Sequence, residues 1–328
     1  MTVIRQNIID SALITRHKSK LIIAAKIAIA GGLLIYLINQ VNFNAIINAI
    51  KDADIFFILA ALLLLVLNIN LQYLKWKVVC TNVLGINERK RVLASLFYGF
   101  SAGSFTPGRI GEYFGRALSF KDKPVSDVAV AAFVDKTISL LVITFIGALS
   151  SILFLHFYYH VTFFITASLF IFVFALSYIF LFLVFNPSIW KNSVISKIKS
   201  TKRLAFLVEK LSALKKIDKS TVYKVAAISV LFFICMLLQY VLLVSAFSHH
   251  FDLLNYLWVG ILIFFAKSII PPVSIGDLGI REGASVFFIS FIGENGSIGF
   301  NASIFLFLIN ILIPAVIGMF LLFQKDND

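Results

Sequence analysis

Residues 101–117 read SAGSFTPGRIGEYFGRA, and residues 271–283 read PPVSIGDLGIREG. The two stretches share the pattern P-x-x-I-G-[ED]-x-x-x-R. Each comes at the end of an apolar run of 14 residues, Val92 to Phe105 in the first case and Leu257 to Ile270 in the second. A helix of that length measures about 21 Å and is too short to cross a bilayer. We therefore interpret both runs as the descending limbs of re-entrant hairpins that turn back at the proline motif.

The composition indicates a membrane protein. Of 328 residues, 60% are hydrophobic and 14% are charged, against roughly 45–50% and 25% in an ordinary soluble domain. The polar remainder is too short for a soluble catalytic domain, so we expect an all-α polytopic membrane protein with six transmembrane helices and two re-entrant hairpins. The six apolar runs that reach or approach the length of a ~30 Å hydrocarbon core are 21–38, 55–74, 128–155, 161–185, 225–247 and 304–323.

The positions of the basic residues predict the orientation. The segment from Lys75 to Arg91 carries five Lys or Arg against one acid, and the loop 186–224 carries ten against two. The positive-inside rule places both in the cytoplasm. Both termini are then cytoplasmic, the segments around His160 and His249 are external, and the chain is expected in the cell (inner) membrane. The net charge of +13 lies beside the spans, where it meets anionic lipid, so nucleic acid is not expected as a partner.

The architecture around the two motifs also repeats. Two spans, a short limb, the motif and one further span occur twice, and the two copies begin with spans of opposite direction. This pattern predicts an inverted-topology repeat, which is typical of secondary transporters with a binding site near the membrane midplane. We expect a single membrane domain over residues 1–328. Repeat one covers about 21–155 and repeat two about 161–323, with the basic loop 186–224 inside repeat two.

Charged residues of the motifs are the candidate site. Glu112 precedes Arg116 by four residues, and Asp277 precedes Arg281 by the same spacing, so each pair can form on a helix. Further ionisable side chains expected at membrane depth are Arg109, Asp135, Lys136, Lys267 and Glu282. Helix-breaking residues that can turn backbone N–H groups toward an anion are Pro107, Gly108, Gly111, Pro271, Pro272 and Gly276. Two roles stay open: these charges bind a substrate, or they pair internally and hold the hairpins together.

The two stretches, together with VDK at residues 134–136, resemble the transmembrane region of the lysylphosphatidylglycerol synthetase/flippase family. The resemblance covers nearly the whole chain and implies a lipid flippase. It also implies that the sequence, which ends at Asp328, is similar to stand-alone members without the soluble aminoacyl-transferring domain. Asp135 and Lys136 stand where Glu-Arg is common. By this resemblance the first motif is carried by Pro107, Arg109, Gly111, Glu112 and Arg116, and the second by Pro272, Gly276, Gly279, Arg281 and Glu282.

Three functional classes follow from these observations. The leading hypothesis is a transporter that moves a lipid with a charged, phosphate-containing headgroup between leaflets. Transport would be passive or ion-coupled, because no G-x-x-x-x-G-K-[ST] phosphate loop is present. The second class is an intramembrane enzyme that acts on lipid or peptide, in which Asp135 and Asp277 could form a carboxylate pair that shares a proton. The third class is a non-transporting scaffold. We expect no enzyme activity, no cofactor and no metal site.

Overall fold

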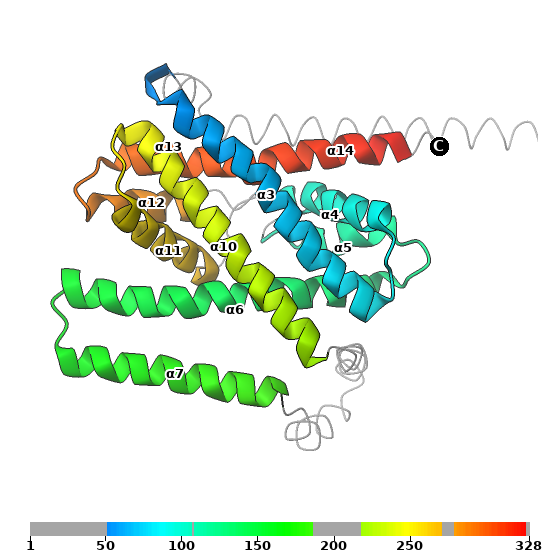
Figure 1. The fold of residues 1–328 in the computed structure, drawn as a ribbon, viewed down its shortest axis with the longest axis horizontal. Coiled ribbons are helices and arrows are strands. Elements are labelled where there is room, and N and C mark those ends of the chain that lie inside the picture. The colour runs from blue at the N-terminus through cyan, green and yellow to red at the C-terminus, as the bar shows by residue number, and fades with distance from the viewer. Residues whose placement is uncertain (1–50, 107, 186–217, 271–278, 326–328) are drawn as a thin grey trace, which may run out of the picture. The chain divides into compact units, whose positions relative to one another are not determined.

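The computed structural model describes residues 51–106, 108–185, 218–270 and 279–325, and the elements in these ranges are helical (Figure 1). The chain divides into two compact units, Met1–Lys51 and Asp52–Asp328. All described residues except Lys51 belong to the second unit. The predicted span 21–38 and most of the predicted basic loop 186–224 therefore lie outside the described residues.

Four helical stretches are long and apolar enough to cross a membrane, and they confirm four of the predicted spans. The predicted run 161–185 forms α7 (Phe163–Phe185), whose crossing stays a prediction. The four stretches are α3 (Ile55–Val79) with the π-helical turn Cys80–Leu84, α6 (Val125–Tyr158), α10 (Lys219–Ser248), and α13 (Gly296–Phe307) continued through the π-helical turn Leu308–Leu312 into α14 (Ile313–Lys325).

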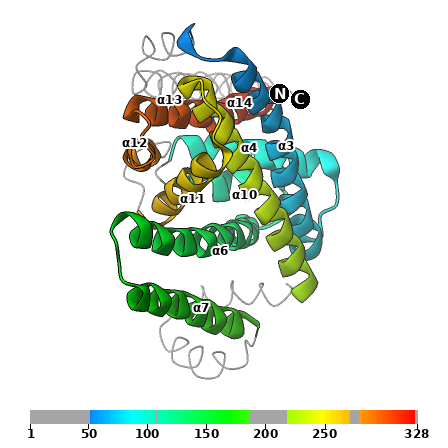
Figure 2. The same cartoon turned by 60° about the vertical axis from the view of Figure 1, so that its left-hand side comes forward.

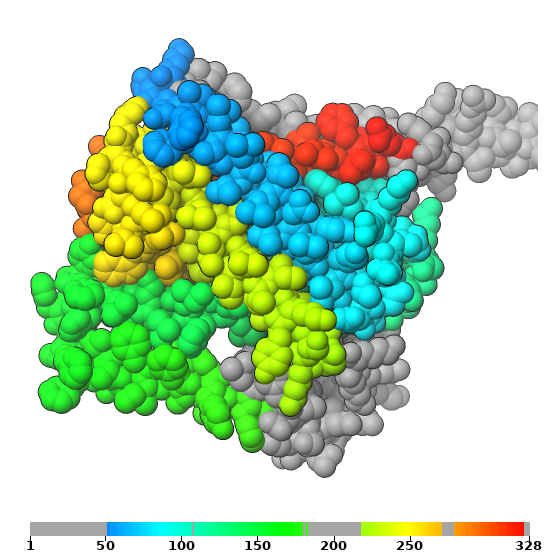
Figure 3. Space-filling view, viewed as in Figure 1, coloured from blue at the N-terminus to red at the C-terminus, as the bar shows by residue number. Residues whose placement is uncertain are grey.

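Helices α3 and α10 form an antiparallel pair that lies across one face of the second unit (Figure 3). At one end the backbone N–H of Asp54 donates to the carbonyl of Ala246 at 2.9 Å. At the other end Asn82 donates to Thr221 at 2.7 Å. Between them the fully buried Asn68 amide donates to Gln239 Oε1 at 3.3 Å. Such hydrogen bonds hold apolar helices together where lipid offers no polar partner.

The first proline motif forms a helical hairpin. Helix α4 (Arg89–Ser104) descends, and the chain returns as α5 (Gly111–Gly115) followed by a 3-10 turn, Arg116–Ser119. The return segment packs at backbone distance, because a Cβ on Gly111 would lie 2.2 Å from the carbonyl oxygen of Ala102. Gly108 and Arg109 make the turn with φ of 61° and 55°. The chain therefore turns back after a short helix, as the predicted hairpin requires, while Pro107 lies outside the described residues.

The second motif lies between α11 (Leu253–Ile269) and α12 (Ile280–Ser290), which pack against each other (Figure 2). The hydroxyl of Tyr256, near the start of α11, donates to Glu294, just after the end of α12, at 2.7 Å. The two helices therefore run in opposite directions, as the prediction of a second hairpin requires. The predicted motif residues that lie outside the described residues here are Pro271, Pro272, Gly276 and Asp277.

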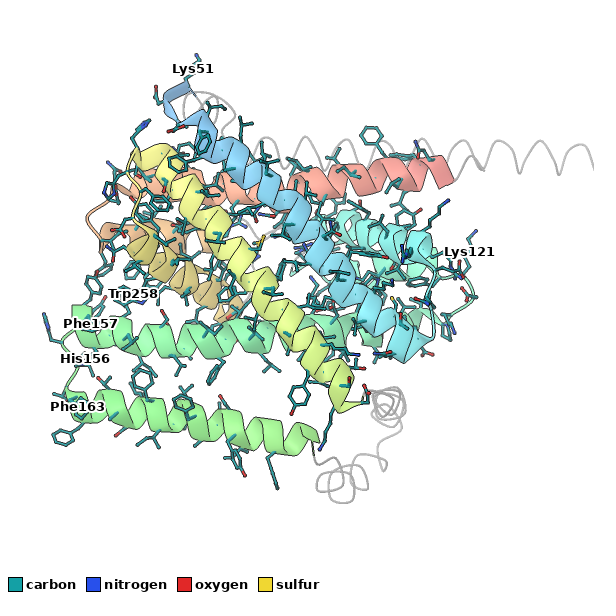
Figure 4. The ribbon with its side chains drawn as sticks, in the orientation of Figure 1. Lys51, Lys121, His156, Phe157, Phe163 and Trp258 are labelled. Carbon is teal, nitrogen blue, oxygen red and sulfur yellow. The ribbon has the colours of Figure 1, made fainter. Side chains whose placement is uncertain are left out.

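Helix α6 packs against both hairpins. The hairpin that contains α5 contacts the first half of α6 through Asp135 and Lys136. Helix α11 begins beside the end of α6, where the rings of Trp258 and Phe157 lie 6.3 Å apart (Figure 4). Its last turn reaches the middle of α6, where Ser268 Oγ lies 3.5 Å from Thr144 Oγ1. The hairpins thus run along α6 from opposite ends.

Helix α14 packs against α4 much as α6 packs against α11. Ser101 Oγ donates to the carbonyl of Ala315 at 2.6 Å. On the other side of the fold, a Cβ on Gly147 of α6 would lie 2.4 Å from the Cβ of Phe265 in α11. The helix that follows each hairpin therefore contacts the other hairpin at close range. The position of the hairpins in a bilayer and the inverted repeat itself stay predictions.

Candidate functional site

Six charged side chains gather where α3, the first hairpin and α6 meet, and we call them the first charge cluster. Helix α5 places Glu112 at its start, and Arg116 follows one turn later. Two glycines of α4 allow these side chains to lie flat against that helix: a Cβ on Gly99 would lie 2.7 Å from Arg116 Cγ, and a Cβ on Gly103 would lie 3.0 Å from Glu112 Cβ. The members of the cluster are Lys75, Arg109, Glu112, Arg116, Asp135 and Lys136.

Arg116 is the centre of the cluster. Its Nη2 donates to Glu112 Oε1 at 2.7 Å, and its Nη1 donates to Asp135 Oδ2 at 2.9 Å. The guanidinium lies over the ring of Trp76, 4.4 Å from the centroid, in a cation–π contact. Only 2% of the Arg116 side chain is exposed, and 1% of each carboxylate side chain. The predicted pair of Glu112 with Arg116 is confirmed, and Asp135 completes it.

Lys75 is a member of the cluster that the sequence reasoning missed. Its Nζ lies 3.3 Å from Asp135 Oδ1 and donates to Ser139 Oγ. We expected the span to end at Leu74, but α3 continues to Val79 and Lys75 is 6% exposed. The cytoplasmic placement of the segment that follows stays a prediction. The spacing held a signal, because Lys75 lies seven residues after the buried Asn68, on the same face of the helix.

Arg109 and Lys136 form the accessible edge of the cluster. Both contact the same atom, Glu112 Oε2, and Arg109 Nη2 lies 3.1 Å from it. The side chains of Arg109 and Lys136 are 17% and 31% exposed, whereas those of the other four members are at most 7% exposed. Among the described residues of the cluster, three buried atoms have no hydrogen-bond partner: Nε of Arg109, Nε of Arg116 and Oδ1 of Asp135, whose contact with Lys75 is an ion pair at 3.3 Å. These two guanidinium groups therefore keep donors that the contacts within the cluster leave unused.

The second motif makes a smaller and closed arrangement. Arg281 Nη2 donates to Glu282 Oε1 at 2.8 Å, and its Nε donates to Ser303 Oγ at 3.0 Å. Glu282 Oε2 in turn accepts the backbone N–H of Gly279 at 2.6 Å and closes the first turn of α12. The predicted partner Asp277 lies outside the described residues. Lys267 is half-buried in the last turn of α11.

These helices and buried ion pairs define a multi-pass membrane protein with charged residues inside its helical bundle. A family model for the lysylphosphatidylglycerol synthase TM region matches residues 23–318. The chain belongs to this family, which agrees with the resemblance that its two motifs show and supports a role connected with membrane lipids. No curated protein matches the chain.

Proposed function

We propose that this protein is a flippase-like transporter that moves a lipid with a phosphate-containing headgroup between membrane leaflets. The observation that carries the proposal is the edge of the first charge cluster, where the partly exposed Arg109 and Lys136 share one oxygen of Glu112. Isolated charges at membrane depth are costly and mark substrate pathways. Here, two cations share one acceptor atom and lie where a ligand can reach them.

The contacts within the cluster suggest different roles for its arginines. A headgroup phosphate offers several acceptor oxygens, so it can replace Glu112 Oε2 as the partner of both edge cations. A planar guanidinium can bind such a group bidentately, and this is the role we assign to Arg109. Arg116 is held by two carboxylates and by Trp76. We therefore assign Arg116 a positioning role. It holds Glu112 in place next to Arg109 and Lys136, where a headgroup phosphate can replace the Glu112 carboxylate.

The packing around α6 supports transport as the overall activity. The two hairpins run along α6 from opposite ends, and α3 and α10, the spans before them, are antiparallel. This is the arrangement expected of inverted repeats, in which two broken segments meet near the midplane. The proposal places the protein in the inner membrane with both termini in the cytoplasm, and with transport that is passive or ion-coupled.

Asp135 bears on the alternative that the protein is an intramembrane enzyme. Each of its two carboxylate oxygens contacts a cation, Oδ2 with Arg116 and Oδ1 with Lys75. A catalytic aspartyl pair instead shares a proton between two carboxyl groups. Among the described residues Asp135 is thus paired with cations and not with a second carboxyl group, and this favours the transporter over an aspartyl enzyme.

Reconstitution into liposomes tests the proposal. A lipid labelled on its acyl chain is quenched from outside with dithionite, and the quenched fraction reports movement between leaflets. We expect protein-dependent movement, at least tenfold slower with Arg109→Lys, which keeps the charge but loses bidentate binding. Arg89→Lys, the same change at an exposed position at the start of α4, is the control and should leave the rate unchanged.

Two results would contradict the proposal. One is the lack of protein-dependent movement for every labelled lipid offered. The other is a chemically altered lipid, detected by mass spectrometry, that forms only with the protein and would identify an enzyme. A wild-type rate in Arg109→Lys would leave transport standing but remove Arg109 from the headgroup site.

A further inference from the structure

The first charge cluster has more positive than negative charge. Its four cations, Lys75, Arg109, Arg116 and Lys136, face only two carboxylates, Glu112 and Asp135, which leaves a net charge of +2 among the described residues. Uncompensated charge is costly where most of the cluster is buried. An anion that enters at the exposed edge would remove this cost, and the edge cations Arg109 and Lys136 would bind it.

From this charge balance we infer that the site selects a headgroup that carries two negative charges, a phosphate monoester, over a phosphodiester with one. The inference rests on the proposed function and names the substrate class of the same site. A dianionic monoester brings the cluster to neutrality, whereas a monoanionic diester leaves one positive charge. A headgroup that carries an amine, as a lysylated one does, adds a cation to a site that already has an excess.

A change at Lys75 tests this inference without altering either of the edge residues that would contact the ligand. It contributes one of the two excess charges, yet it contacts Asp135 and Ser139 in the interior and is 6% exposed. Lys75→Gln lowers the net charge of the cluster to +1 and leaves the edge residues in place. The variant should therefore lose part of its preference for the dianion. Lys77→Gln, two residues further along α3 and not a member of the cluster, is the matched control.

Binding to the purified full-length protein in detergent is measured first, with short-chain phosphatidic acid as the monoester and short-chain phosphatidylglycerol as the diester. At pH 7.5 we expect phosphatidic acid to bind at least tenfold more tightly. At pH 5 the monoester holds one proton and is a monoanion, since its second pKa is about 6, and the preference should fall at least threefold. The titratable groups around the edge are Glu112, Asp135 and Lys136 of the cluster, with Tyr113 and Cys80 beside them. At pH 5 both lipids carry one negative charge, so a change in the charge of these groups affects the two lipids alike.

The variants decide the cause of the preference. We expect Lys75→Gln to reduce the ratio of the two affinities at least threefold at pH 7.5 and Lys77→Gln to leave it unchanged. Equal affinities of the wild type for the two lipids at pH 7.5 would overturn the inference, and so would a ratio that does not change with pH. If Lys75→Gln does not fold, the pH dependence of the wild type still decides.

Liposome measurements separate this inference from the proposed function and separate a lipid from free phosphate. Movement of both lipids at the same rate would overturn the dianion preference and leave the flippase standing. Movement of neither would overturn the flippase, while the binding ratio still decides the inference. Inorganic phosphate shares the chemistry and should compete for binding. Uptake of radiolabelled phosphate into the vesicles would identify free phosphate as the cargo and overturn the assignment to a lipid.

Discussion

Asp135→Asn should destabilise the protein far more than the removal of Lys75, its partner. Asp135 Oδ2 lies 2.9 Å from Arg116, and Oδ1 lies 3.3 Å from Lys75. At an effective dielectric constant of ~20, each contact corresponds to a gross attraction of about 5–6 kcal/mol. The desolvation of the Asn amide costs less free energy than that of the Asp carboxylate, and this difference offsets several kcal/mol of the lost attraction. We expect a net loss of about 3–5 kcal/mol, the range found when one partner of a buried ion pair is removed.

Lys75→Met removes the ion pair between Lys75 and Asp135 by changing the cation instead of the carboxylate, and its consequence for stability differs. It lowers the net charge of the cluster from +2 to +1, and Asp135 keeps its contact with Arg116. The long apolar Met side chain fills most of the space. We expect a loss of at most about 1 kcal/mol, because relief of the charge excess offsets the lost contact. The double variant should be more stable than the sum of the two single losses predicts, by about 1–3 kcal/mol.

Equilibrium unfolding of the four proteins in mixed micelles with increasing sodium dodecyl sulfate measures these differences. Asp122→Asn is the control, because Asp122 forms an exposed ion pair with Arg91 and should change stability little. A loss below about 1 kcal/mol for Asp135→Asn would refute the buried-charge reasoning. Equal losses for Asp135→Asn and Lys75→Met would show that the cluster has no excess of positive charge in solution.

Three further changes test the packing and the helix ends. Gly318→Ala places a Cβ 2.1 Å from the carbonyl oxygen of Phe97 and should cost at least about 1–3 kcal/mol in the same unfolding assay, whereas Gly283→Ala, with nothing within 4 Å, should be tolerated. Asp252→Ala removes the N-cap of α11 and should cost about 1 kcal/mol. Hydrogen bonds to the Asp252 carboxylate lower its pKa, so its stabilisation is present above the unfolded pKa of about 3.9 and is lost as the pH falls through the lower folded pKa. The stabilities of wild type and variant should therefore converge in acid. Ser303→Ala should reduce stability by about 1 kcal/mol and leave lipid movement at the wild-type rate, because it serves only the closed second arrangement.

The first hairpin was predictable because its signals are local. A run of 14 apolar residues is too short to span, and glycine and proline at its end force a reversal, so α4 and α5 fall within a few residues of the expected positions. The pair of Glu112 with Arg116 followed from helical spacing alone. Features that depend on one turn of helix are visible in the sequence without knowledge of the rest of the fold.

The remaining partners in the cluster could not be derived in this way. Asp135 meets Arg116 across 19 residues and Lys75 across 60, and no periodicity encodes these distances. Composition also places the end of a span at its first lysine, whereas α3 continues because a carboxylate on another helix compensates Lys75. Burial of a charge next to a distant partner is a tertiary effect, so the hydropathy rule misplaces such a residue.

The two predicted repeats differ in their charges, and the sequence shows where. Pro107 and Pro272 lie 165 residues apart, and the same offset places Tyr240 opposite Lys75, Ser274 opposite Arg109, and Phe300 and Asn301 opposite Asp135 and Lys136. At four of the six cluster positions the second repeat has a neutral residue. Tyr240 is buried like Lys75, but its hydroxyl pairs with Ser285 at 2.8 Å. In the proposed transporter two hairpins enclose the path but one anion site is enough for one headgroup, and the proposed site lies among the charges of the first predicted repeat.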